Sequence, residues 1–352
     1  MGRKPVRVAV IGCGAVVERF HAPALTALAH RGEVEVVALC DPDTARVGAF
    51  AATFPRAAAL TSIAGVAATR PDLGVIASPA GLHADHSIAL LDAGIHVLCE
   101  KPIAPKVADA ERMIAAAAGR RRVLAVGLFR RFFPSARLVR DLVLSGRLGA
   151  FQSGTILETG GFHWPFRSTS AFLPELTPGG ILLDIGVHVL DLLTWWFPGV
   201  RVTAYQDDAM GGAEATALAT FHVSHSPLTM KLSRDWPMAG RYELRFEHGR
   251  IVWDAVDPVN VQLQYFGPGA EVRLVAGAVP AQSWGDCFRA QLENAIAAVR
   301  GESAPLVSGA DAVRSLLLIE ECYRMRTLLS SPWFTDAEVK AAQEAAAEKV
   351  TC

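Results

Sequence analysis

The first third of the chain alternates short apolar runs with segments of helical spacing, and this alternation restricts the fold more than any other feature. Five runs have the character of buried strands: VRVAVIG, VEVVALCD, DLGVIAS, HVLCE and RVLAVG. Helical patterns such as HADHSIALLDAG and KVADAERMIAAAAG separate them. Strands that alternate with helices pair in parallel and form a doubly wound sheet. We therefore expect an α/β fold whose first domain covers residues 1–126.

The pattern changes after Gly127. Runs of alternating character, such as EATALATFHVSH, PLTMKLSRDW and YELRFEHGRIVWDA, follow one another with turn residues between them. This is typical of an antiparallel sheet, and a length of 352 residues favours two domains. We expect the second domain to cover residues 127–334 and a helical tail to cover residues 335–352.

Composition excludes several classes of protein. A formal net charge of −1 gives no sign of a nucleic-acid partner or an acidic membrane surface. No apolar run is long enough to span a bilayer, and the N-terminus lacks the features of a signal peptide. The six cysteines are scattered without a CxxC pair, which favours reduced thiols over disulfides or a zinc site. We expect a cytoplasmic protein without nucleic-acid or membrane partners.

A glycine-containing turn follows the first strand, in VAVIGCGAV. Gly12 and Gly14 would let the backbone approach a pyrophosphate closely, and the helix that starts near Ala15 and Val16 would offer free N–H groups. The full dinucleotide fingerprint has a third small residue, where this chain has Val17. A simple strand-to-helix turn also explains the two glycines, so the motif alone leaves both interpretations open.

An acidic residue at the end of the second strand strengthens the nucleotide hypothesis. Asp41, in VVALCDPD, stands where the fingerprint has an acid for the adenosine ribose hydroxyls. Its carboxylate would repel a 2′-phosphate, which favours NAD over NADP. The same residue could instead be a turn or N-cap aspartate before Pro42. Arg46 is near enough in sequence to offset part of the repulsion.

The apolar segment GGILLDIGVHVLDLLTWW, residues 179–196, contains Asp184, His188 and Asp191. On a helix the spacings i, i+4 and i+7 put all three on one face. Burying a charge without a partner is costly, so such groups are usually paired or functional. Carboxylate and imidazole groups on one face can also bind zinc or iron. No outside ligand is evident in the sequence, and we therefore expect no metal.

The motif CEKPIAP places Glu100, Lys101 and Pro102 directly after the carboxyl end of a buried strand. Ligands of open α/β sheets bind at that edge. A surface lysine that merely ends the strand would give the same local pattern.

Four segments carry a resemblance to a known enzyme family: GCGAVVERFHAPAL, SPAGLHADHSIALLDAGIHVLCEKPIA, VGLFRRFFPS and GGILLDIGVHVLDLLTWW. In order and spacing they resemble the glucose–fructose oxidoreductase / inositol dehydrogenase / MocA (Gfo/Idh/MocA) family over nearly the whole chain. The resemblance implies an N-terminal Rossmann domain and a C-terminal α/β domain with an open, mostly antiparallel sheet. Two positions depart from the family pattern: Val17 replaces a small residue, and Ala80 stands where Asn is usual.

By this resemblance, Lys101, Asp184 and His188 act on the substrate beside the nicotinamide of bound NAD. Oxidation of a secondary alcohol requires a base for the hydroxyl proton, and imidazole suits this role at neutral pH. We expect His188 to take the proton and Lys101 to stabilise the developing alkoxide. Asp184 would orient the imidazole or hold a neighbouring substrate hydroxyl, and Asp191 would be structural.

Further contacts are expected from the same resemblance. The cofactor-binding residues would be Gly12, Gly14, Ala15, Val16, Asp41, Arg46, Ser78, Pro79, Leu82, His83, Glu100, Lys101 and Arg130. The substrate-binding residues would be Lys101, Arg131, Phe162, His163, Trp164, Arg167, Asp184 and His188. The aromatic loop around Trp164 suits the apolar faces of sugar rings, although Trp164 and Phe166 could equally fill a core. Arg130 and Arg131 could instead be a solvated pair.

The sequence predicts an NAD-dependent dehydrogenase or ketoreductase that acts on a sugar, an amino sugar or a cyclitol. Two alternatives stay open: an enzyme that cleaves glycosides by transient oxidation and elimination with bound NAD, and a nucleotide-sensing regulator. The presence of Lys101, Asp184 and His188 disfavours the regulator, because loss of the catalytic residues would be its signature.

Apolar residues at alternate positions of the second sheet suggest an assembly surface, for example Phe221, Val223, Leu244 and Phe246. Because the chain's own helices can cover only one face of the sheet, a bare apolar face would mark an interface. We therefore expect a homodimer or homotetramer through the C-terminal sheet.

Overall fold

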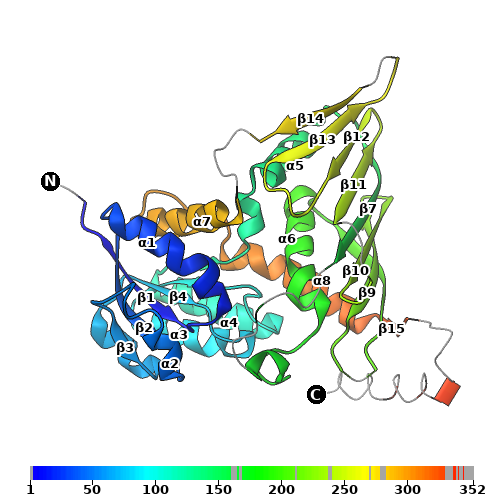
Figure 1. The fold of residues 1–352 in the computed structure, drawn as a ribbon. Helices are drawn as coiled ribbons and strands as arrows, with labels where there is room; N and C mark the ends of the chain where they lie inside the picture. The colour runs from blue at the N-terminus through cyan, green and yellow to red at the C-terminus, as the bar shows by residue number, and fades with distance from the viewer. Residues whose placement is uncertain are drawn as a thin grey trace. The chain divides into compact units, whose positions relative to one another are not determined.

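The structure is a computed structural model that describes residues 3–159, 165, 169–210, 212–236, 240–268, 271–277, 283–329, 336, 337, 340 and 344. The chain divides into two compact units (Figure 1). The N-terminal unit consists of residues 1–132, 164–178 and 283–313, and the C-terminal unit of residues 133–163, 179–282 and 314–352. Each unit is assembled from separate stretches of chain, whereas the sequence led us to expect contiguous domains.

The N-terminal unit contains a six-stranded parallel sheet of order β3-β2-β1-β4-β5-β6. Its strands are β1 (Val6–Ile11), β2 (Val34–Cys40), β3 (Ala58–Leu60), β4 (Leu73–Ile76), β5 (His96–Cys99) and β6 (Leu124–Val126). The order reverses between β1 and β4, which is the switch point where open α/β sheets bind ligands. The doubly wound parallel sheet expected from the sequence is confirmed.

Helices and short helical turns connect these strands or come later in the chain and belong to the same unit. They are η1 (Val17–His21), α1 (Ala22–His30), α2 (Thr44–Gly48), η2 (Ile63–Thr69), η3 (Ala80–Leu82), α3 (His83–Asp92), α4 (Val107–Arg120), η4 (Phe129–Phe132), η5 (Thr169–Phe172) and α7 (Trp284–Val299). α7 comes late in the sequence but lies beside α1 (Figure 1), and Leu292 and Ile296 of α7 share a core with Leu25 and Leu28 of α1.

The C-terminal unit contains a nine-stranded mixed sheet of order β14-β13-β12-β11-β7-β10-β9-β8-β15. Only the β7–β10 and β8–β15 pairs are parallel, so the sheet is mostly antiparallel, as expected. Its strands are β7 (Phe151–Thr159), β8 (Arg201–Asp207), β9 (Thr216–Val223), β10 (Ser226–Ser233), β11 (Arg241–Phe246), β12 (Gly249–Trp253), β13 (Asn260–Tyr265), β14 (Val272–Ala276) and β15 (Arg326–Leu328). Its helices are α5 (Pro134–Leu144), η6 (Leu182–Gly186) and α6 (Val187–Trp196), and α8 (Gly309–Arg324) enters it from the N-terminal unit. Within the described ranges, no helix is long and apolar enough to cross a membrane.

The two faces of this sheet differ in character. One row of paired positions is apolar and closely buried; apart from Gly154 its members are Phe221, Leu228, Leu244, Ile251 and Leu263. Helices α5 and α6 pack on this face, where the Trp196 ring contacts Tyr242 and Trp253. The adjacent row lies on the opposite face and is polar in the central strands, with Thr220, Thr229, Thr155 and Glu243; it continues through Val252, Gln262 and Leu274.

This arrangement corrects the reason given above for an assembly surface. Phe221, Val223, Leu244 and Phe246 are all buried within the single chain, so they are core residues and not a bare apolar patch. A dimer or tetramer through the sheet stays a prediction, and it would have to use the polar outer face.

Replacing Phe221 by alanine tests which face the chain itself covers. Phe221→Ala should lower the free energy of unfolding by about 3–5 kcal/mol, because it leaves a cavity in a packed core. Thr220→Ala, one position along on the outer face, should change it by less than about 0.5 kcal/mol. Both values should be the same at low and high protein concentration in urea titrations. A loss at Phe221 that grows on dilution would instead place this residue at a subunit interface.

Candidate active site

The carboxyl edge of the parallel sheet is held together by backbone hydrogen bonds between neighbouring strand ends. In each case the first residue after a strand donates its N–H to the last carbonyl of the next strand in the sheet, at 2.7–2.8 Å: Gly12 to Cys40, Ala77 to Ile11, Glu100 to Ile76 and Gly127 to Cys99. The loops that follow β1, β4, β5 and β6 therefore start from fixed points along one edge.

The glycine turn after β1 packs tightly on one side and is open on the other. Gly12 has a φ of +90°, and a Cβ atom there would lie 2.5 Å from the carbonyl oxygen of Ala77. A Cβ atom on Gly14 would have no described atom within 4 Å. Helical structure begins at Ala15 and continues through η1, and the first N–H groups of a helix have no intrahelical partners. The turn fits a pyrophosphate group.

Asp41 closes this turn from the end of β2. Its Oδ2 accepts the N–H of Cys13 at 2.8 Å, and its Oδ1 accepts the N–H of Asp43 at 2.9 Å. The guanidinium of Arg46 pairs with both carboxylates, at 3.6 Å from Asp41 and 3.2 Å from Asp43. Asp41 is thus a turn residue at the end of β2, with both carboxylate oxygens bound to backbone N–H groups. Arg46 brings a positive charge to the same place.

The loop after β5 is braced through the buried carboxylate of Glu100. Its Oε1 lies 2.7 Å from His21 Nε2, and its Oε2 accepts the N–H of Lys101 at 3.2 Å. A Cβ atom on Gly127 would come within 2.9 Å of this carboxylate. Glu100 therefore holds the backbone of Lys101 in place, a role that the sequence did not predict.

His83 connects the loop after β4 with the loop after β5. Its Nδ1 lies 2.8 Å from the carbonyl oxygen of Pro102, and its Nε2 lies 2.8 Å from that of Ser78. Burial lowers the pKa of His83, so the ring is neutral near pH 7 and donates one N–H to one of the two carbonyls. Ser78 is held again through its hydroxyl, 3.0 Å from His86 Nδ1. His83 thus supports the loop of Lys101 from beneath.

The helix that carries His188 lies in the C-terminal unit and is buried on nearly all sides. It begins with the π-helical turn η6 and continues as α6. The side chains of His188 and Asp191 are buried, at 6% and 1% relative exposure, whereas the side chain of Asp184 is 49% exposed. The three groups therefore do not share one environment, as a uniform α-helical face would predict. Among the described residues, no group of three or more His, Cys, Asp or Glu side chains is placed to hold a metal.

Arg234 is the partner of Asp184. Its Nη2 lies 2.5 Å from Asp184 Oδ2, and its side chain is 15% exposed. Arg234 directly follows β10, and its backbone N–H donates to the carbonyl oxygen of Ala215 at 2.9 Å. Sequence reasoning missed this arginine. The available signal was a charged residue at the end of a buried strand, in KLSRDW.

The remaining sequence-predicted residues fall into three groups. Ser78, Pro79 and Leu82 are half-buried in the segment between β4 and α3. Arg130 and Arg131 are both buried in η4, so the alternative of a solvated pair is wrong. The Arg131 guanidinium lies 3.6 Å from Asp311 Oδ1. The candidates in the aromatic loop lie outside the described residues: Phe162, His163, Trp164 and Arg167.

Two family models match this chain over most of its length. The model of the Gfo/Idh/MocA oxidoreductases with an NAD-binding Rossmann fold matches residues 6–128, and the model of the Gfo/Idh/MocA C-terminal domain matches residues 136–252. The chain belongs to the Gfo/Idh/MocA oxidoreductase family.

The chain is also similar to individual proteins and to solved structures. D-glucoside 3-dehydrogenase of Escherichia coli K12 is 33% identical over 60% of this chain and 60% of its own length. The scyllo-inositol 2-dehydrogenase (NADP(+)) of Bacillus subtilis is 28% identical over 74% of this chain and 80% of its own length. The WlbA dehydrogenase of Bordetella pertussis, solved with NADH and UDP-GlcNAcA, shares the fold with a TM-score of 0.75 at 21% identity, over 92% of this chain and 96% of that one.

The position of Arg46 leads to a prediction about the cofactor. Because this guanidinium offsets the charge of Asp41, Arg46→Ala should weaken binding of NADPH about tenfold, as expected for one lost charged contact. Binding of NADH should change much less. Titration by nucleotide fluorescence measures both affinities. Arg120→Ala, which removes an exposed pair with Asp92 in the same unit, is the control. Equal weakening of both nucleotides would show that Arg46 acts only on the turn.

Proposed function

We propose that the protein is an NAD(H)-dependent dehydrogenase or ketoreductase. It would transfer a hydride between the nicotinamide and a secondary alcohol or ketone carbon of a sugar, an amino sugar or a cyclitol. The observation that carries this proposal is the arrangement of His188 and Asp184 on one helix. A buried imidazole follows, by one turn, a carboxylate that is half-exposed and paired with Arg234.

The first group of residues would hold the dinucleotide. The N–H groups that follow Gly14 would bind the pyrophosphate, and Asp41 would accept hydrogen bonds from the adenosine ribose. We expect NADH to bind more tightly than NADPH, because a 2′-phosphate would meet the carboxylate of Asp41. The relatives include both an NADP(+) enzyme and a fold neighbour solved with NADH. In this chain the opposite charges of Asp41 and Arg46 would set the preference between NADH and NADPH. Bound NAD supplies the hydride acceptor.

The second group would handle the proton and the developing charge. His188 would take the hydroxyl proton as the carbon–hydrogen bond breaks, and it would return a proton to the ketone oxygen in the reverse direction. Lys101 would donate to the same oxygen and stabilise its negative charge. The pair of Asp184 and Arg234 presents both an acceptor and donors, which suits the vicinal hydroxyl groups of a polyol.

The substrate class is supported by the chemistry of the relatives. The names of two of them specify a glucoside and an inositol, which both contain rings of secondary alcohols. A panel of hexoses, amino sugars and cyclitols would identify the reacting carbon and the physiological direction of the reaction. Net accumulation of NADH would support the dehydrogenase, and release of aglycone without NADH would indicate glycoside cleavage.

Loss of His188 tests the assignment of the base. His188→Ala should slow hydride transfer about 10²–10⁴-fold, which is the typical contribution of a positioned acid or base. The increase of the oxidation rate with pH should disappear with it. The rate should be measured in single turnovers by NADH absorbance, because slow product release can mask the chemical step.

Lys101→Met is the companion variant. It should retain nearly the wild-type affinity for NADH, because the glycine turn and Asp41 provide most of that binding, and it should lose most of the turnover. If His188→Ala transfers hydride at the wild-type rate across the pH range, the base is not His188. The role would then pass to Lys101.

A further inference from the structure

Three successive backbone N–H groups at the start of the His188 helix are bound by one residue, Glu214. Its Oε1 accepts the N–H of Gly180 at 3.2 Å and the N–H of Leu182 at 3.0 Å. Its carbonyl oxygen accepts the N–H of Ile181 at 2.9 Å. The start of a helix normally leaves such groups without intrahelical partners, and a carboxylate there also interacts favourably with the helix dipole.

The fit around Glu214 leaves the helix start little freedom. A Cβ atom on Gly180 would lie 2.1 Å from the carbonyl oxygen of Glu214. The carboxylate also accepts the hydroxyl of Tyr323 at 2.8 Å. Glu214 itself is 2% exposed. The first helical turn is therefore held by both the buried carboxylate and the backbone carbonyl of Glu214.

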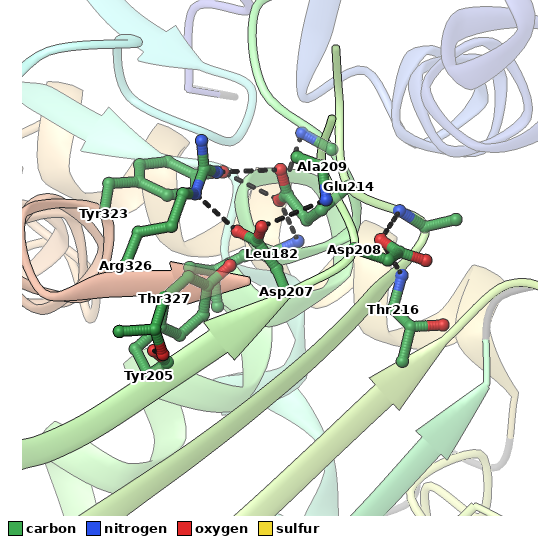
Figure 2. Close-up of polar contacts among 12 residues, drawn as sticks. Leu182, Tyr205, Asp207, Asp208, Ala209, Glu214, Thr216, Tyr323, Arg326 and Thr327 are labelled. Carbon is green, nitrogen blue, oxygen red and sulfur yellow. Dashed lines mark hydrogen bonds and ion pairs between the residues drawn. The ribbon is translucent and has the colours of Figure 1, made fainter. Parts of the chain in front are cut away.

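The neighbouring residue holds the other half of the Asp184 pair. The carbonyl oxygen of Ala215 accepts the N–H of Arg234, whose guanidinium binds Asp184. Glu214 and Ala215 are consecutive, so one short segment fixes both the helix that carries Asp184 and the strand end that carries Arg234. Asp208 in turn holds this segment, because its Oδ1 accepts the N–H groups of Ala215 and Thr216 at 2.9 Å each (Figure 2).

The charges around Glu214 come from β8, α8 and β15 (Figure 2). Arg326 lies with Nε 2.7 Å from Asp207 Oδ2 and with Nη2 3.5 Å from Glu214 Oε2. Burial raises the pKa of Glu214 and of Asp207, and Arg326 opposes this at Asp207. Burial also raises the pKa of Tyr323 well above its ordinary value, so its hydroxyl stays a donor to Glu214. Arg326 thus contacts both buried carboxylates, and the hydroxyl of Tyr323 donates to that of Glu214.

We propose that Glu214 is a positioning residue for the reaction: it fixes the start of the helix so that Asp184 and His188 keep their productive geometry. The proposal rests on the function proposed above for the roles of those two residues. Displacement of a catalytic group by about 1 Å can cost up to about 10²-fold in rate. The contribution of Glu214 should therefore appear in the chemical step and not only in stability.

Two variants separate the acceptor from the charge. Glu214→Gln keeps an oxygen that can accept from Gly180, Leu182 and Tyr323, whereas Glu214→Ala removes it. We expect Glu214→Ala to slow single-turnover hydride transfer about 10–10²-fold, with unchanged affinity for NADH. Glu214→Gln should restore most of that rate. Amide hydrogen exchange at residues 180–182 should be faster in the alanine variant and close to wild type in the glutamine variant.

The control is Asp257→Ala. Asp257 also accepts two backbone N–H groups in the C-terminal unit, those of Val259 and Asn260, but it does not contact the His188 helix start. It should lower thermal stability without changing hydride transfer in the folded protein. If Glu214→Ala does not fold, Glu214→Asp replaces it, because the shorter side chain keeps the charge and draws the acceptor away from the helix.

The outcomes distinguish this proposal from the proposed function. Hydride transfer and amide exchange at the wild-type level in the folded alanine or aspartate variant would overturn the positioning role and leave the dehydrogenase intact. The same slowing in Asp257→Ala would also overturn it, since the effect would then be general destabilisation. If no panel substrate reduces NAD with the wild-type protein while exchange at residues 180–182 still depends on Glu214, the proposed function fails, and the anchoring of the helix stands.

Discussion

The hydrogen bonds that join neighbouring strand ends set the geometry on which the N-terminal unit depends. At the carboxyl edge, the first backbone N–H of each loop donates a hydrogen bond to the last carbonyl of the neighbouring strand. Backbone hydrogen bonds alone therefore fix where three loops begin: the glycine turn, the segment of Ser78 and the loop of Lys101. The side chains of Glu100 and His83 add further contacts to the loop that carries Lys101. A parallel sheet supplies such an edge because all its strands end on the same side.

In the C-terminal unit, polar side chains lie on a helix that is surrounded by apolar core. Some of the polar contacts in this chain lie at the start of the helix, where backbone N–H groups are available in any case. Glu214 binds those groups, and the half-exposed Asp184 finds a cation on the adjoining strand end. The remainder of α6 is buried in the core together with His188 and Asp191, and Trp196 packs against the aromatic residues of the sheet.

Local patterns predicted the parallel sheet, the glycine turn with Asp41 and the buried helix of residues 181–196, because each depends on spacing within a short segment. Contacts between distant segments were not predictable in this way. Arg234 lies 50 positions from Asp184, and their pairing depends on where β10 ends. The apolar row of Phe221 was expected to mark an assembly surface but is buried within the single chain, because a strand pattern does not show whether the chain's own helices or a second subunit cover a face. Likewise, two adjacent arginines suggest solvent until the fold places η4 in the interior.

The two glycines of the first turn illustrate how a motif can combine unrelated requirements. Gly12 is needed by the polypeptide, because β4 ends too close to it for any side chain. Gly14 has no such neighbour among the described atoms, so the described fold does not require a glycine there, and its small size would matter for the pyrophosphate proposed to bind beside the turn. A descendant of this protein could therefore replace Gly14, abandon the nucleotide and still fold. In comparisons between relatives, loss of the second glycine would then indicate a change in ligand binding, whereas the first glycine is required by the fold whether or not a ligand binds.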